Sequence, residues 1–350
     1  MKLEDFDFEL PESQIARFPA ERREGARLLV YQRETGETRH AAIPELVGCL
    51  RPGDLLVLND VRVAPARLDL RRATGGAVEA LALRWQGADL WMLADGRGRL
   101  KPGEVLEVDR DPALRVVLFD REREGWRACV EGASAEELLR RCGKVPLPPY
   151  IRKARERDGV EESAVEPLDR ERYQTVFAAE GAAVAAPTAG LHLSEPVLAA
   201  LAAREVKITK VRLHVGPGTF APVRTSNLDE HRMELERYEI PEEAAAAIRA
   251  TRAAGGRVVA VGTTVVRTLE GAAARHGELR AGAGETDLFI RPGFPFRVVD
   301  ALMTNFHLPQ STLLMLVSAF AGREATLALY REAVSRGYRF YSYGDAMLLL

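Results

Sequence analysis

The sequence has few cysteines and no recognisable pattern among them. There are three, Cys49, Cys129 and Cys142, which is an odd number, and no pair has the spacing of metal ligands. This argues against a disulfide framework and favours reduced thiols in a cytoplasm. The N-terminal stretch MKLEDFDFEL also lacks the basic and apolar regions of a signal peptide. We therefore expect a cytoplasmic protein.

Long hydrophobic runs and an excess of one charge are missing as well. The longest apolar run, LLMLVSAFA from Leu313, is far shorter than the roughly 20 residues that span a bilayer. Lys and Arg number 49 against 51 Asp and Glu, so the net charge is -2. A near-neutral total argues against a generic nucleic-acid coat, although it leaves room for a local basic face. No membrane partner is expected.

Hydrophobic residues, in contrast, are abundant. They make up 47% of 350 residues, and this length is typical of about two domains. The stretch DLLVLND, residues 54–60, is a continuous apolar strand that stops on polar residues, as buried strands do. From Arg170 onward, apolar strands alternate with helical patterns, which predicts a mostly parallel sheet with outer helices.

The segment between Arg67 and Glu131 has a different character. Short alternating stretches such as AVEALAL and LRVVLFD are separated by the turns TGG, DGRG and KPGE, which favours a small antiparallel barrel or sandwich. The following VPLPPYIRKARERDG resembles a linker. We predict an α/β main domain formed by residues 1–62 and 149–350, and an inserted β-barrel domain at residues 63–148.

Polar residues follow several of the predicted α/β strands. Ligands of α/β sheets bind beyond the carboxyl ends of the strands, so several such clusters in one domain predict a shared polar cleft. The clusters are Asn59, Asp60 and Arg62; Thr188, Gly190 and His192; His214, Gly216, Gly218 and Thr219; Gly262, Thr263, Thr264 and Arg267; Thr304, Asn305 and His307; and, in the last turn, Ser342, Tyr343 and Asp345.

Two of these clusters have an ordinary structural alternative. The stretch Gly262–Thr264 would offer free N–H groups and a positive helix end to a carboxylate or phosphate, but Thr263 or Thr264 would equally serve as a helix cap. The stretch HVGPGTF, residues 214–220, is glycine-rich, but it lacks the lysine of a P-loop and the spacing of a dinucleotide fingerprint. A tight turn explains it as well.

The histidines and the basic residues also leave alternatives open. His231 lies in DEHRMELE, whose spacing identifies no third metal ligand, so no metal is predicted. Two stretches rich in cations would form either a solvated linker or a surface for a phosphate backbone. They contain Arg140, Arg141, Lys144, Arg152, Lys153, Arg155 and Arg157, and Arg62, Arg67, Arg71 and Arg72.

The motifs taken together resemble one family. In chain order they are PGDLLVLND, RYQTVFA, VAAPTAGLH, LHVG-x-GTF, VVAVGTT-x-VRTLE, VDALMTNFHLP and RFYSYGDAM. They are similar to the S-adenosylmethionine:tRNA ribosyltransferase-isomerase family of the queuosine pathway. The resemblance implies transfer and isomerisation of the ribose moiety of S-adenosylmethionine onto 7-aminomethyl-7-deazaguanine at the tRNA wobble position. Epoxyqueuosine-tRNA, adenine and methionine would be the products.

The resemblance also implies partners and a site. The partners would be S-adenosylmethionine as co-substrate, with no other cofactor, and tRNA with a GUN-type anticodon. The sequence does not fix the oligomeric state, and we expect a monomer. Histidines poised near neutrality suit the acid–base chemistry. The catalytic hypothesis comprises His192, His214, His307 and Asp345. The expected S-adenosylmethionine contacts are Thr188, Gly190, Thr219, Gly262, Thr263, Thr264, Arg267 and Asn305.

The sequence departs from the family pattern at two positions where a hydroxyl is common, Val61 and Val265. Each valine would remove a substrate contact. Two other function classes remain. An ordinary S-adenosylmethionine-dependent tRNA methyltransferase would need a glycine-rich loop after its first strand, which DLLVLNDVRV lacks. A non-catalytic tRNA-binding protein would explain the basic stretches but not the polar strand ends.

Overall fold

The computed structural model describes residues 1–350 except 123–124, 180–182, 217–224 and 226. The chain folds into two compact units. The first comprises Met1–Val61, Gln174–Glu180 and Ala186–Leu350, and the second comprises Arg62–Tyr173 and Gly181–Ala185. The second unit therefore includes residues 149–173, which the sequence analysis assigned to the α/β domain.

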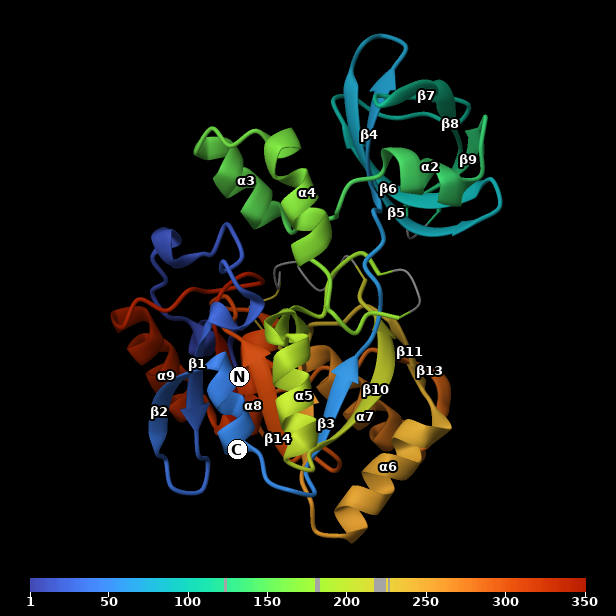
Figure 1. Ribbon diagram of the computed structural model, residues 1–350. Coiled ribbons are helices and arrows are strands. Elements are labelled where there is room, and N and C mark those ends of the chain that lie inside the picture. Colours follow the sequence, from blue (N-terminus) through green and yellow to red (C-terminus); the bar gives the residue numbers. More distant parts are fainter. Residues whose placement is uncertain (123–124, 180–182, 217–224, 226) are drawn as a thin grey trace. The chain divides into compact units, whose positions relative to one another are not determined.

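The first unit is built on a mixed nine-stranded sheet (Figure 1). Its strand order is β13-β11-β10-β3-β12-β14-β15-β1-β2. In chain order the strands are β1 (Arg27–Tyr31), β2 (Thr38–Ala42), β3 (Leu55–Asn59), β10 (Lys207–His214), β11 (Glu236–Ile240), β12 (Val258–Val261), β13 (Gly282–Thr286), β14 (Ala301–Asn305) and β15 (Ala346–Leu349). The four central strands β10, β3, β12 and β14 run parallel, and β15 pairs parallel with β1. The flanking β2, β11 and β13 pair antiparallel, as do β14 and β15.

Helices cover both faces of this sheet, and α5 and α7 lie on opposite sides of it in Figure 1. The helices of this unit are α1 (Leu46–Cys49), α5 (Glu195–Ala203), α6 (Glu242–Ala253), α7 (Thr263–His276), α8 (Thr312–Ala321) and α9 (Arg323–Ser335). Alternate residues of β3 point to opposite faces. Leu56 and Leu58 join a core with α1 and α5, and α6 and α7 also pack against β3. Burial on both faces explains why every residue of β3 is apolar until Asn59.

The described helices were tested for the length and apolarity of a membrane span. None of them passes alone, and α8 passes only when it is joined to α9 across a bend of 114°. Ser311 caps α8 by accepting a hydrogen bond from the Leu314 amide at 3.2 Å, and Gly322 follows the end of the helix.

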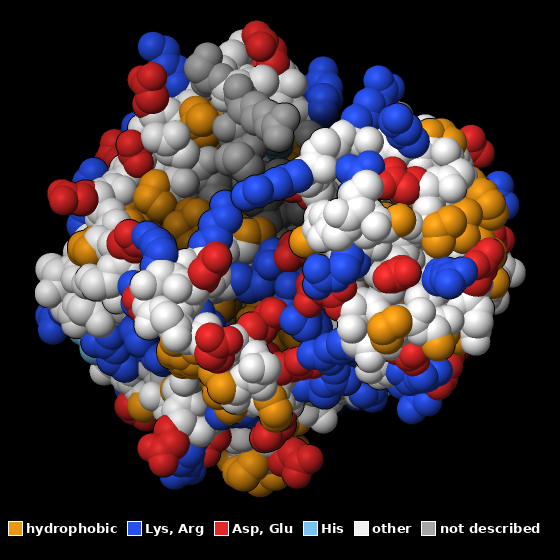
Figure 2. Space-filling model, turned by 90° about the horizontal axis from the view of Figure 1, so that it is seen from above, with side chains coloured by type: hydrophobic (Ala, Val, Ile, Leu, Met, Phe, Trp, Pro, Cys, Tyr) orange, Lys and Arg blue, Asp and Glu red, His pale blue; other side chains and the backbone are white. Residues whose placement is uncertain are grey.

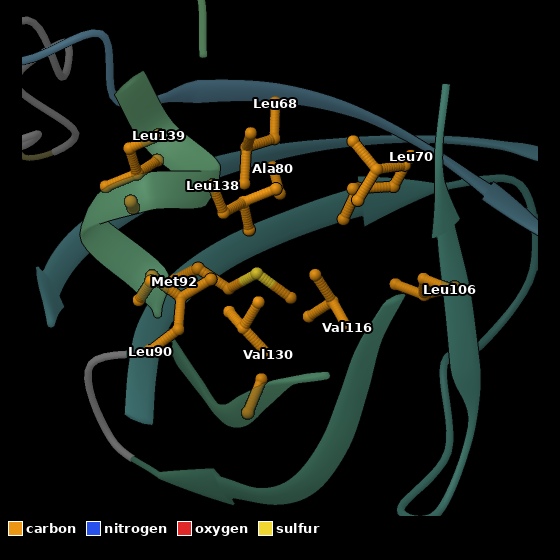
Figure 3. Packing of buried hydrophobic residues seen from close by; sticks show 14 of the residues in the cluster. Leu68, Leu70, Ala80, Leu90, Met92, Leu106, Val116, Val130, Leu138 and Leu139 are labelled. Atoms are coloured by element: carbon orange, nitrogen blue, oxygen red, sulfur yellow. The ribbon is translucent and has the colours of Figure 1, made fainter. Parts of the chain in front are cut away.

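The second unit contains a closed six-stranded antiparallel barrel in the order β4-β5-β6-β9-β8-β7. Its strands are β4 (Arg67–Arg72), β5 (Ala77–Gln86), β6 (Asp89–Gly96), β7 (Val105–Val108), β8 (Asp111–Glu122) and β9 (Gly125–Glu131). Alternate side chains such as Leu68, Leu90 and Val116 fill the interior. Leu138 and Leu139 of helix α2 (Ala135–Cys142) join this core (Figure 3).

The stretch that resembled a linker is helical. It forms α3 (Pro149–Arg157), and α4 (Glu162–Arg172) follows it. Pro149 suits the first turn of a helix because it needs no donor there. Ile151 is fully buried, and the buried Arg155 forms an ion pair with Asp169 of α4 at 2.6 Å. Tertiary contacts thus order a segment whose composition is typical of a linker. The predicted class, an α/β unit with an inserted antiparallel barrel, is confirmed.

Candidate active site

The strand order of the first unit brings the predicted polar clusters to one edge of the sheet. The neighbouring parallel strands β10, β3, β12 and β14 end at or next to His214, Asn59, Gly262 and Asn305. Because parallel neighbours end at the same edge, these residues line it in that order. These strand ends lie along one edge of the sheet, as the predicted polar cleft requires, and the cleft itself stays a prediction.

Asn59 connects the end of β3 to two neighbouring elements, β10 and α7. Its Nδ2 donates to the Leu213 carbonyl at 3.1 Å, and its Oδ1 accepts from the Leu213 amide at 3.2 Å. The same Nδ2 lies 3.5 Å from Thr264 Oγ1 at the start of α7. With 1% of its surface exposed, Asn59 fixes the end of β10 and the first turn of α7 relative to β3.

The turn before α7 is glycine for a conformational reason. Gly262 has φ of 94°, a region that favours glycine, and its amide donates to the Met303 carbonyl of β14 at 2.8 Å. Gly262 itself is the N-cap and supplies no capping side chain. The alternative in which Thr263 or Thr264 caps the helix is therefore wrong. The uncapped first turn keeps the amide groups and positive dipole end that bind anions.

Arg267 lies one turn further along α7 and is 4% exposed. Its Nη1 forms an ion pair with Glu236 of β11, and its Nε donates to the Leu288 carbonyl at 3.3 Å. Its Nη2 is buried and has no hydrogen-bond partner among the described residues. The sequence analysis missed Glu236. Buried and exposed residues alternate along β11, and Glu236, Tyr238 and Ile240 are the buried ones. This alternation in the sequence could have indicated that the Glu236 carboxylate is buried.

His192 ends a short 3-10 helix, Thr188–His192, which packs against β14. Its Nε2 lies 3.2 Å from Asn305 Nδ2. Burial lowers the pKa of His192 to about 4; the charge of Asp345 opposes this shift and that of Arg339 adds to it. The imidazole is therefore neutral near pH 7.

His307 follows β14 and is equally enclosed. Its Nε2 lies 2.9 Å from Thr304 Oγ1, and its backbone amide donates to the Tyr330 hydroxyl at 3.1 Å. Burial alone lowers the pKa of His307 to about 3. This value and that of His192 lie well below the near-neutral range expected from the sequence, because burial disfavours the charged ring. The neutral imidazole of His307 still has a lone pair that can accept a proton.

Asp345 has other partners than the catalytic hypothesis expects. Its Oδ1 accepts from the Arg27 amide at 2.9 Å, and its Oδ2 accepts from Arg27 Nη2 at 3.0 Å and from the Arg339 amide at 2.8 Å. The carboxylate thus fastens the C-terminal turn to β1. It acts on His192 through its charge.

The remaining residues of the predicted site, Gly190, Thr188, His214 and Thr219, lie in different surroundings. A Cβ on Gly190 would lie 2.8 Å from Phe177 Cζ and 3.0 Å from Thr175 Cγ2. Gly190 therefore permits close packing within the protein, whereas the sequence analysis assigned it to a close approach by substrate. Thr188 and His214 are half-buried. Thr219 lies outside the described residues.

The two valines that replace common hydroxyl residues are both fully buried. Val61 and Val265 have 0% of their surface exposed, so these positions belong to the core. That each valine removes a hydroxyl able to contact substrate stays a prediction.

The two cation-rich stretches, for which the sequence left a solvated linker and a phosphate-binding surface open, are largely neutralised within the second unit. Arg140 pairs with Glu137, Arg141 with Asp111, Lys144 with Asp69 and Glu162, Arg152 with Glu79, and Arg155 with Asp169. Arg67, Arg71 and Arg72 pair with Glu162, Asp109 and Glu104. Figure 2 shows Lys and Arg side chains interspersed with Asp and Glu on the face in view. These stretches provide ion pairs that hold the unit together.

His231, the residue that the sequence analysis considered for a metal site, packs edge-on against Phe289 with ring centroids 5.1 Å apart. Within the described part of the chain, no group of three His, Cys, Asp or Glu residues is placed to hold a metal ion.

Comparison with known proteins agrees with this arrangement. The model of the family described as queuosine biosynthesis protein matches residues 3–349. The chain is 50% identical to an S-adenosylmethionine:tRNA ribosyltransferase-isomerase of Anaeromyxobacter dehalogenans, covering 100% of this chain and 99% of the relative. It is 49% identical to the protein of the same name from Pelobacter propionicus, with 100% of both chains covered.

A solved structure is also similar. The crystal structure of an S-adenosylmethionine tRNA ribosyltransferase from Thermotoga maritima matches with a TM-score of 0.56 and 37% identity, covering 99% of this chain and 100% of that one. Since the family model and the relatives span practically the whole sequence, this chain belongs to the queuosine biosynthesis protein family.

Proposed function

We propose that this protein is an S-adenosylmethionine:tRNA ribosyltransferase-isomerase. It transfers and isomerises the ribose moiety of S-adenosylmethionine onto 7-aminomethyl-7-deazaguanine at the tRNA wobble position, and it releases adenine and methionine. The observation that carries this proposal is the match, at about half identity over the full length, to relatives with this name. The polar sheet edge supports it, because the chemistry needs proton transfer in an enclosed site.

The methionine part of the co-substrate fits the start of α7. Its carboxylate would accept hydrogen bonds from the uncapped amides of Thr263 and Thr264 and would be stabilised by the positive end of the helix dipole. The buried Nη2 of Arg267, which has no partner among the described residues, supplies a cation one turn away. An orphaned guanidinium nitrogen is costly to bury, and an anionic ligand would satisfy it.

The histidines would transfer the protons in this reaction. The sulfonium acidifies the neighbouring ribose carbon, so a neutral base must remove that proton, and an acid near adenine assists its departure. The low pKa values of His192 and His307 keep both imidazoles neutral at pH 7. His214 at the end of β10 completes the set, and Thr188 and Thr219 would bind ribose hydroxyls.

Asn305 supplies a further ligand contact. It is 2% exposed, and its Oδ1 has no hydrogen-bond partner in the part of the chain that the structure describes. An N–H or O–H of the bound co-substrate would satisfy it. We place no metal in the reaction. The tRNA would carry a GUN-type anticodon and be bound by a monomer in the cytoplasm.

A release assay tests the function. The protein is incubated with S-adenosylmethionine and tRNA carrying 7-aminomethyl-7-deazaguanine, and free adenine and the mass of the tRNA are measured. Adenine release with a matching gain in tRNA mass is the expected result. S-adenosylhomocysteine with a methylated tRNA would identify a methyltransferase, and tRNA binding with no product would identify a binding protein.

A further inference from the structure

The side-chain amide of Asn305 has only one orientation that its surroundings permit. Its Nδ2 lies 2.9 Å from the carbonyl oxygen of Tyr341 and 3.5 Å from that of Ser342. A carbonyl oxygen can only accept hydrogen bonds, so the atom facing these two oxygens must be the NH₂ group. The hydrogen bonds of Asn305 are therefore defined without ambiguity.

The same NH₂ group reaches His192. It lies 3.2 Å from His192 Nε2, and an amide NH₂ has no lone pair to offer. Nε2 must therefore be the acceptor and carry no proton. A neutral imidazole has one ring proton, which must then lie on Nδ1. No described residue is a hydrogen-bond partner of His192 Nδ1.

The carbonyl that orients Asn305 is itself held by an unusual turn. Tyr341 has φ of 74°, a conformation that is rare for an aromatic residue. Its amide donates to the Phe306 carbonyl at 3.0 Å, and its carbonyl also accepts from the Gly344 amide at 2.9 Å. A Cβ on Gly344 would lie 2.5 Å from the Arg339 carbonyl oxygen, so this tight turn requires glycine.

His307 lacks such a constraint. Its Nε2 faces the hydroxyl of Thr304 at 2.9 Å, and a hydroxyl can either donate or accept. Both neutral tautomers of His307 are therefore compatible with its surroundings, and its ring can present a lone pair to a ligand.

We propose that Asn305 is a positioning residue that holds His192 in the tautomer protonated on Nδ1. The Tyr341 carbonyl fixes Asn305 in this role. His192 then presents a hydrogen-bond donor to the bound ligand, while His307 is left to abstract the proton. This division of roles rests on the proposed function, but the tautomer of His192 does not.

Nuclear magnetic resonance of the intact protein tests the tautomer directly. Histidine side chains are labelled with ¹⁵N, and the ring nitrogens are correlated with the ring carbon-bound protons at pH 7. The His192 signals among the six histidines are assigned with a His192→Gln variant. An unprotonated Nε2 with a protonated Nδ1 is the expected pattern in the wild type, and the reverse pattern would overturn the proposal.

Variants then test the cause. Asn305→Asp replaces the donor with an acceptor, so the His192 proton should move to Nε2, and kcat/KM should fall by about 10²-fold. Thr304→Val is the matched control, because it alters the surroundings of His307 and should leave the His192 pattern unchanged. Tyr341→Gly keeps the backbone carbonyl and should keep the tautomer.

An unchanged His192 pattern in folded Asn305→Asp would show that Asn305 does not set the tautomer. The wild-type spectrum, once assigned with His192→Gln, decides the tautomer itself even if Asn305→Asp or Tyr341→Gly fails to fold. Absence of adenine release with the expected tautomer would contradict the proposed function and leave the positioning role intact.

Discussion

Arg267 of α7 and Glu236 of β11 form an ion pair in which both side chains are at least 96% buried. We expect Glu236→Ala to lower the free energy of unfolding by about 3–5 kcal/mol, because it leaves a buried guanidinium without its counter-charge. Urea denaturation measures this. Glu285→Ala removes an exposed carboxylate from Arg237 on β11 and should cost less than about 1 kcal/mol. Equal effects of the two variants would contradict the interpretation.

Arg267→Gln should weaken the binding of S-adenosylmethionine about 10- to 100-fold, the effect of losing a charge-assisted hydrogen bond of roughly 1.5–3 kcal/mol. Calorimetric titration measures the dissociation constant. Decarboxylated S-adenosylmethionine serves as the control ligand, because it lacks the anion that Arg267 would bind. An equal loss for both ligands would indicate a general distortion of the site and argue against carboxylate recognition.

His307→Gln should reduce kcat for adenine release by about 10²- to 10⁴-fold, the usual effect of losing a general base. The KM for S-adenosylmethionine should change little, since the residue would act on the reacting proton. Thermal unfolding of the variant checks that the fold is retained. Full activity in a folded His307→Gln protein would remove this residue from the catalytic set.

The buried histidines should make stability depend on pH. Their folded pKa values, about 4 for His192 and about 3 for His307, lie below the unfolded value near 6.5. Between these limits the unfolded chain binds more protons, so stability is complete above about pH 6.5 and falls as the pH decreases. Across the full window His192 should contribute about 3 kcal/mol and His307 about 5 kcal/mol.

Urea denaturation at pH 7 and pH 5 measures this dependence. A His192→Gln, His307→Gln double variant should lose less stability between the two pH values than the wild type does. The exposed His276 provides a control, and His276→Gln should follow the wild-type curve. Parallel curves for the double variant and the wild type would contradict the assignment.

Gly190→Ala should destabilise the protein by about 1–3 kcal/mol, because its Cβ would meet the Phe177 ring at 2.8 Å. Gly48→Ala is the matched control. It lies in helix α1, and a Cβ there would meet nothing within 4 Å. This control should be neutral or slightly stabilising. Phe177→Leu should relieve the Gly190→Ala defect in part, and no relief would place the strain elsewhere.

Periodicity and strand ends predicted the main features of the fold. The apolar stretch that ends at Asn59 predicted a buried strand, and the polar residues after β10, β12 and β14 predicted a shared edge. Both predictions rest on local sequence patterns, because the burial of a strand and the position of its end follow directly from the geometry of a parallel sheet. The helix α3 was missed because its order depends on Ile151 and on the ion pair of Arg155, which are tertiary contacts.

The sequence predicted which residues belong to the candidate site better than it predicted what each of them does. The sequence indicated Arg267, Asn305 and the histidines, but Glu236 lies on a strand far along the chain from α7. The functions of Gly190 and Asp345 depend on their neighbours, Phe177 and Arg27. The alternation of β11 could have indicated that Glu236 is buried, but which residues these side chains meet is fixed only when distant segments pack together.

The closed ring of β4 to β9 has a consequence for synthesis of the chain on the ribosome. Strand β3 emerges early, but its sheet neighbours β10 and β12 follow only after the whole barrel has been made. The barrel can pair all of its strands in the meantime, and a closed ring exposes no strand edge to other nascent chains. The apolar β3 therefore stays without these sheet neighbours while the barrel forms, and we expect it to be a binding site for chaperones during synthesis.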